Sequence, residues 1–132
     1  MSEVLASLKK KGGGITEKSL WTNNAPSAAY SSDTVTLSEN LDNYDYVKVK
    51  FRRSTGASTE YEVWTIPTVS SDNKFLMNLA IRISNDFYAR SVSHYVNNTI
   101  LFGSTIKFFT SGSVSTANSY CIPLEVIGVK VN

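Results

Sequence analysis

The stretch that decides the fold is YCIPLEVIGVKV, at residues 120–131. From Ile122 to Val126 every second residue is apolar, and a period of two is typical of a strand with one buried face. From Ile127 to Val131 the apolar residues occupy the odd-numbered positions, whereas before that they occupy the even-numbered ones. A strand changes its buried face only through an extra residue in the ladder, so we predict a β-bulge between Val126 and Gly128. The alternative is that both faces of the second half are covered, by core on one side and by a neighbouring subunit on the other.

Length and composition predict one domain that is rich in strands. The chain has 132 residues, enough for a buried core, and Val, Ser and Thr each outnumber Leu. We expect a short helical or extended arm with a glycine joint at residues 1–14, and a β domain at residues 15–132. Thirteen basic and 11 acidic residues give a net charge of +2. This near-neutral balance argues against nucleic acid as a partner.

Alternating apolar residues recur at intervals of about ten residues along the β domain, which is typical of a sandwich or barrel. We predict a single antiparallel β-sandwich, jelly-roll-like, with a kink at Gly103 in its seventh strand. Residues 38–44 are expected to form one helical turn capped by Ser38, and residues 111–119 an exposed loop. The expected strands are 15–22, 34–37, 46–52, 59–66, 74–84, 87–96, 99–109 and 120–131.

The N-terminal arm has an amphipathic pattern. Val4, Leu5 and Leu8 share one face of a helix over residues 2–11. Three lysines lie at its C-terminal end, where their positive charges interact favourably with the helix dipole. Glycines at 12–14 end the helix and form a joint. A helix this short is marginal alone, so we expect it to be held either by a partner chain or by its own domain.

No residue pattern predicts catalysis. His94 is the only histidine and Cys121 the only cysteine, and neither has the partners of a catalytic triad or of a zinc site. We therefore predict no catalytic residue, no metal ligand and no cofactor. No apolar run approaches the length of a membrane span, so we expect no membrane insertion, and residues 1–11 lack the apolar core of a signal peptide.

A carbohydrate site is the one ligand site that the residues suggest. Sugar binding combines exposed aromatic rings with amides or carboxylates, and such residues cluster at both ends of the strand at 87–96. The candidate ligand-binding residues are Asn85, Asp86, Tyr88, His94 and Tyr95. The alternative is that Phe87 and Tyr88 simply begin a strand.

Several segments together resemble small tail-fibre and virion-surface proteins of bacteriophages. The likeness covers Leu20 to Val131 and is a pattern of strand edges. The segments are Leu20-Trp21-Thr22-Asn23, Pro26-Ser27, Thr34-Val35-Thr36-Leu37, Tyr44-Asp45-Tyr46-Val47-Lys48-Val49 and Cys121-Ile122-Pro123-Leu124-Glu125-Val126-Ile127-Gly128-Val129-Lys130.

The resemblance implies a structural, non-enzymatic virion component, commonly homotrimeric, assembled in the bacterial cytoplasm and displayed on the tail or capsid. Its partners would be other virion proteins, reached through Val4, Leu5 and Leu8 of the arm. The alternative function is an adhesin head that binds a host-surface receptor or glycan. The two differ in whether the arm or the loops of the β domain do the essential work.

Overall fold

The computed structural model describes residues 14–67, 74–95 and 97–132, which form ten β-strands and one short 3-10 helix. Most of the expected arm, including Val4, Leu5 and Leu8, lies outside the described residues. The elements are β1 Ile15–Thr22, β2 Asp33–Thr36, η1 Leu41–Asn43, β3 Tyr46–Ser54, β4 Glu60–Thr65, β5 Lys74–Ile83, β6 Asp86–His94, β7 Thr99–Phe102, β8 Ile106–Phe108, β9 Val114–Thr116 and β10 Tyr120–Val131.

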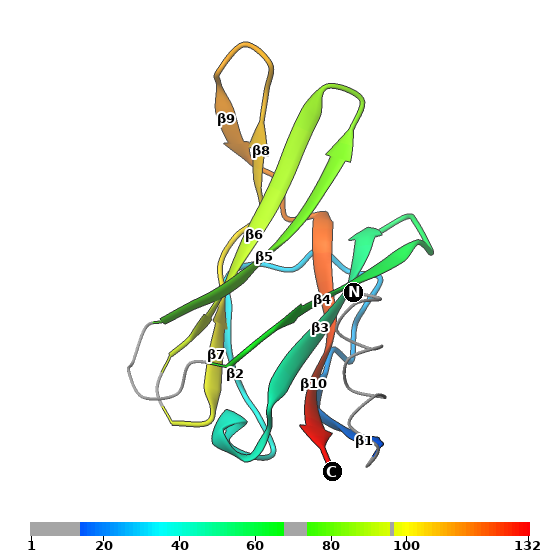
Figure 1. The fold of residues 1–132 in the computed structure, drawn as a ribbon. Coiled ribbons are helices and arrows are strands. Elements are labelled where there is room, and N and C mark those ends of the chain that lie inside the picture. The colour runs from blue at the N-terminus through cyan, green and yellow to red at the C-terminus, as the bar shows by residue number, and fades with distance from the viewer. Residues whose placement is uncertain (1–13, 68–73, 96) are drawn as a thin grey trace.

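The strands form two antiparallel sheets that pack face to face, which confirms the predicted sandwich (Figure 1). Sheet A has the order β1-β10-β3-β4. Sheet B has the order β2-β7-β6-β8-β9, with β5 on the other edge of β6. A core of apolar side chains such as Val49, Leu79 and Phe102, each no more than 2% exposed, fills the space between the sheets.

Strand β10 lies in the interior of sheet A, between β1 and β3. Its bulge is at Leu124, where the register with β3 shifts between Pro123 and Glu125, so the predicted position after Val126 is wrong by a few residues. Both faces of the second half are buried, as the alternative expects, and the neighbouring subunit stays a prediction. Val126 packs into the core, whereas Ile127 packs into a separate cluster on the outer face.

A fully buried arginine joins the two sheets. Arg90 of β6 donates from Nε to the Cys121 carbonyl at 2.9 Å and from its terminal nitrogens to the carbonyls of Gly103 at 2.6 Å and Tyr30 at 2.7 Å. Cys121 has a left-handed backbone, with φ of 53°. Burial lowers the pKa of Arg90 to about 10, so the guanidinium is still charged at neutral pH.

Three local predictions need correction. The strand expected at 99–109 is divided into β7 and β8, as the predicted kink at Gly103 suggests, but residues 114–116 form β9 where a loop is expected. The helical turn is the 3-10 helix Leu41–Asn43, and its cap is Asn40, whose side chain accepts from the Asp42 amide, instead of Ser38. In β5 the expected alternation breaks, because a register shift buries both Leu76 and Met77, whereas Phe75 is 57% exposed.

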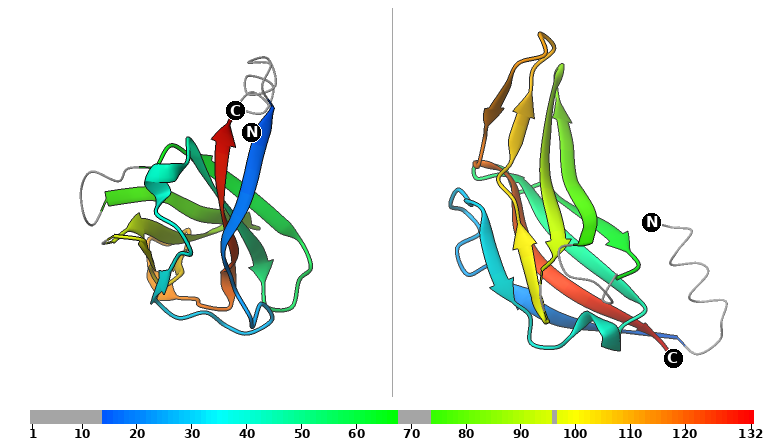
Figure 2. Two further views of the ribbon diagram at one scale, coloured as in Figure 1. Left: turned by 90° about the horizontal axis from the view of Figure 1, so that it is seen from below. Right: turned by 90° about the vertical axis from the view of Figure 1, so that its left-hand side faces the viewer.

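The molecule has two distinct ends. The start of β1 and the end of β10 lie together, because Ile15 pairs with Val131. The β5–β6 and β8–β9 hairpins project from the opposite end, as Figures 1 and 2 show. We call the end with the hairpins the distal end.

Candidate functional site

The structure does not gather the sequence-predicted ligand residues into one site. Asn85 and Asp86 lie at the turn between β5 and β6, at the distal end. His94 ends β6 and Tyr95 follows it, and eight residues of strand separate Asp86 from His94 by about 26 Å at about 3.3 Å each. Tyr95 is 40% exposed, whereas Tyr88 and His94 are buried, at 4% and 3% exposure.

The two buried residues belong to the scaffold, so neither is available to a ligand at the surface. Tyr88 stacks on Tyr120 with ring centroids 4.3 Å apart. The Nζ atom of Lys107 lies 5.6 Å from the Tyr88 ring centroid and 3.5 Å from Asp86, and so ties β8 to β6. Nε2 of His94 lies 2.8 Å from the Asn97 carbonyl oxygen, where it holds the turn into β7.

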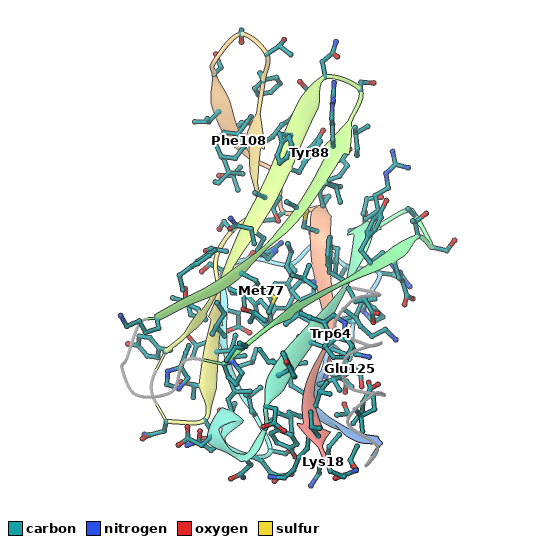
Figure 3. All side chains as sticks on the ribbon, in the orientation of Figure 1. Lys18, Trp64, Met77, Tyr88, Phe108 and Glu125 are labelled. Carbon is teal, nitrogen blue, oxygen red and sulfur yellow. The ribbon has the colours of Figure 1, made fainter. Side chains whose placement is uncertain are left out.

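An apolar surface covers the outer face of sheet A. Val129 has Tyr46 of β3 as its cross-strand partner, and Val131 has Ile15 of β1. Strand β4 contributes Trp64, which Figure 3 labels and whose ring centroid lies 6.3 Å from that of Tyr46. We call this surface the outer apolar face; its residues are Ile15, Tyr46, Trp64, Ile127, Val129 and Val131.

A lysine is embedded in the outer apolar face. Lys48 pairs across strands with Ile127 and Trp64 and is 8% exposed. Its Nζ atom lies 2.5 Å from Glu17, 3.5 Å from Glu62 and 5.1 Å from the Trp64 ring centroid. The two carboxylates compensate the buried charge, so the group is compatible with an apolar surface.

A pocket of about 400 Å³ lies at one end of the outer apolar face. The described residues that line it are Asp45, Tyr46, Ile66 and Val131. Asp45 is fixed there because its Oδ2 atom accepts a hydrogen bond of 2.7 Å from the Val131 amide. Ile66 is 67% exposed, so apolar surface continues beyond the strands.

A second apolar surface lies at the distal end. Phe87 of β6, Phe108 of β8 and Val114 of β9 are consecutive cross-strand partners, and Figure 3 labels Phe108 on its hairpin. Their exposed fractions are 50%, 43% and 60%. We call these three residues the distal patch. Sequence reasoning missed it because β9 is expected to be a loop; the available signal is Val114, an apolar residue among Ser, Gly and Thr.

The described residues give no sign of a metal centre or of a spanning helix. Within 14–67, 74–95 and 97–132, no three His, Cys, Asp or Glu side chains gather where they could hold a metal ion. In the same part of the chain, no helix has the length and apolar character needed to cross a bilayer.

The fold defines the class of this protein, an antiparallel β-sandwich with projecting hairpins at one end. No protein-family model and no curated protein sequence matches the chain.

Proposed function

We propose that the protein is a structural, non-enzymatic subunit of a bacteriophage particle, displayed on its tail or capsid. It docks to other virion proteins through its N-terminal arm, assembles in the bacterial cytoplasm and forms a homotrimer. The sequence resemblance described above motivates the proposal.

The observation that carries the proposal is that the two ends of the molecule differ. The chain leaves the β domain at Gly14, whose carbonyl accepts a 3.1 Å hydrogen bond from the Asn132 amide. The hairpins with the distal patch project from the other end (Figure 2). A subunit attached through residues 1–13 would thus hold its distal end away from the particle, as display requires.

Immunogold labelling of phage particles induced from the source bacterium tests this function. Antibodies raised against the purified chain are expected to label the surface of intact particles, and antibodies preabsorbed with the chain serve as the control. Particles from a phage that encodes the chain without residues 2–11 should lose the label. Unlabelled wild-type particles in a preparation that contains the protein would overturn the proposal.

Light scattering of the purified chain tests the oligomeric state. A homotrimer has three times the subunit mass of 14.5 kDa. A trimer that persists without residues 1–13 would mean that the β domain carries the contacts between subunits. A monomer at all concentrations would contradict this part of the proposal.

The distal patch favours a second candidate function, a head that binds a host-surface glycan. Exposed aromatic rings on a projecting hairpin suit stacking against the apolar face of a sugar, and exposed apolar patches often mark binding sites. Phe87 and Phe108 are side by side on paired strands. Asn85, at the adjoining turn, could supply hydrogen bonds to hydroxyl groups.

Binding of the full chain to immobilised bacterial-surface glycans tests the second function. Replacing Phe87 and Phe108 together by serine should abolish binding if the distal patch is the site. The matched control is Phe75→Ser, since Phe75 is equally exposed but pairs with Ser93 at the opposite end of the hairpin. Equal loss in both variants would argue against a site at the distal patch.

A further inference from the structure

We propose that in the isolated subunit the chain's own N-terminal residues 1–11 cover the outer apolar face, with Val4, Leu5 and Leu8 against it. This inference goes beyond the proposed function, because it concerns the free protein and holds whatever the protein later joins. It chooses between the two possibilities that the sequence leaves open, a partner chain or the protein's own domain.

Sheet A has buried apolar residues on both of its faces, as a sheet in the interior of a protein has. In an antiparallel sandwich the outer face of a sheet is ordinarily polar, because it meets water. Here Val129 is fully buried and Ile127 is 7% exposed, although both lie on the outer face. All six residues of the outer apolar face belong to the strands of sheet A, so this apolar cluster is separate from the core between the two sheets.

The described chain begins at the edge of the outer apolar face. Ile15 and Val131 are cross-strand partners at the edge of the outer apolar face, and Gly14, where the described chain begins, directly precedes Ile15. Gly14 has φ of 72°, a conformation that lets the backbone turn sharply and that suits glycine. The arm is therefore joined to the domain at the edge of the surface that it would cover.

The length of the N-terminal arm matches the length of the outer apolar face. A helix over residues 2–11, as the sequence predicts, would be about 15 Å long at about 1.5 Å per residue. Along β10 the outer apolar face runs from Ile127 to Val131, about 13 Å at about 3.3 Å per residue. An arm of this size fits the face, and its short glycine joint holds it at an effective concentration on the order of millimolar. A separate chain in dilute solution would compete poorly with such a segment.

The charges of the N-terminal arm complement those around the outer apolar face. Around the outer apolar face, Lys48 is paired with both Glu17 and Glu62, and Asp45 lies at the pocket beside Val131. Lys50, the cross-strand partner of Glu62, lies on the same face, so these groups comprise three carboxylates and two lysines. The arm ends in lysines at 9–11, which complement that surplus.

Cross-linking tests the proposal in the full chain. Leu5→Cys is combined with Ser19→Cys, because Ser19 is exposed and pairs with Ile127 at the edge of the outer apolar face. A short bismaleimide should link the two cysteines within one chain, giving a monomer of altered mobility on a denaturing gel. The control combines Leu5→Cys with Ala80→Cys, an exposed position on sheet B, and should not link within the chain. Each single variant reports any reaction of Cys121.

Stability provides a second measurement on the same protein. Leu5→Asp and Leu8→Asp should each lower the urea midpoint of the β domain, because a carboxylate cannot be buried against the outer apolar face. Ala6→Asp is the matched control, since a helix places residue 6 opposite Val4, Leu5 and Leu8. Cross-links formed only between chains would overturn the proposal in favour of arm exchange between copies. Linkage no greater than in the Ala80 control, with unchanged midpoints, would also overturn it.

Discussion

At Arg90 a guanidinium group lies in the interior, and backbone carbonyls take the role that a carboxylate usually has. Its acceptors are the carbonyls of Tyr30, Gly103 and Cys121, with a longer contact of 3.5 Å to Tyr120. These acceptors come from the β1–β2 loop, the β7–β8 connection and the start of β10. One side chain of sheet B thus satisfies buried acceptors at three distant places in the sequence.

Replacement of Arg90 by methionine should therefore lower the free energy of unfolding by about 3–5 kcal/mol, because several buried carbonyls lose their donor at once. Urea denaturation followed by circular dichroism measures the change. Arg82→Met is the control: Arg82 is exposed, donates only to the Ser84 carbonyl among the described contacts, and should change stability by less than about 0.5 kcal/mol. An Arg90→Met protein as stable as the wild type would show that water can replace the guanidinium.

Cys121 is a buried thiol whose chemistry follows from its surroundings. It is fully buried, and burial raises the pKa of the thiol to about 12. Since the ordinary value is 9.0, the native thiol at pH 8 holds about a thousandfold less thiolate than an unfolded one. Ellman's reagent should react slowly with the native protein and rapidly in urea, and comparable rates in the two conditions would contradict the burial.

The same pKa shift makes stability depend on alkaline pH. Between pH 9.0 and about 12 the unfolded chain has released the thiol proton while the folded chain keeps it. The folded state then binds more protons, so the free energy of unfolding falls as pH rises through this window. Urea midpoints from pH 8 to 10.5 should decline more steeply for the wild type than for Cys121→Ala.

At the scale of elements, β10 and the segment before β3 fit together through a glycine. A Cβ atom at Gly128 would lie 2.6 Å from the ring of Tyr44, too close for any real contact. Tyr44 follows η1, and its hydroxyl donates a 2.8 Å hydrogen bond to Glu39. The absent side chain therefore lets this connection lie directly on the central strand of sheet A.

Gly128→Ala should displace the Tyr44 ring and lower the free energy of unfolding by about 1–3 kcal/mol, as overpacking does. Thermal unfolding measures the loss, and the tyrosine resonances in NMR spectra should report the displaced ring. Gly56→Ala is the matched control, because a Cβ there meets nothing within 4 Å. Equal effects at both positions would mean that backbone entropy, and not the contact with Tyr44, decides the result.

Local patterns predict the strands well and the breaks in pairing poorly. β1 occupies the expected residues 15–22, although its register with β10 shifts between Ser19 and Trp21. β9 is missed because Val114-Ser115-Thr116 has little apolar character and pairs only because β8 lies beside it. The bulge at Leu124 is set by pairing with β3, which a single strand does not reveal.

The outer apolar face and the distal patch also differ in how far local sequence patterns predict them. The alternation of the sequence places Ile127 and Val129 opposite Val126, so a covered outer face of sheet A is one of the two possibilities that the sequence offers, the other being a bulge. The distal patch requires knowing that Phe87, Phe108 and Val114 meet across strands, and that information lies in the topology. Tyr88 and His94 look like ligand residues in the sequence, because the sequence does not show which face of β6 is buried.

For the whole molecule, sheet A depends on β10, which supplies the partner of both β1 and β3. A chain that ends at residue 125 would leave β1 without most of its partners, from Ile15 through Trp21. It should fail to unfold cooperatively in urea and should bind hydrophobic dyes. The control chain, which lacks only Asn132, loses the bond to Gly14 and should keep a cooperative transition.

The pairing of β1 with β10 also determines when the protein can fold. Of the described strands β1 is synthesised first, whereas its partner β10 is synthesised last. Contacts between such distant parts of a chain close slowly, so the nascent β1 must wait while the local β5–β6 hairpin can already form. Sheet A can therefore be completed only after β10 has been synthesised, and until then the apolar residues of β1 and β3 are suitable substrates for holding chaperones.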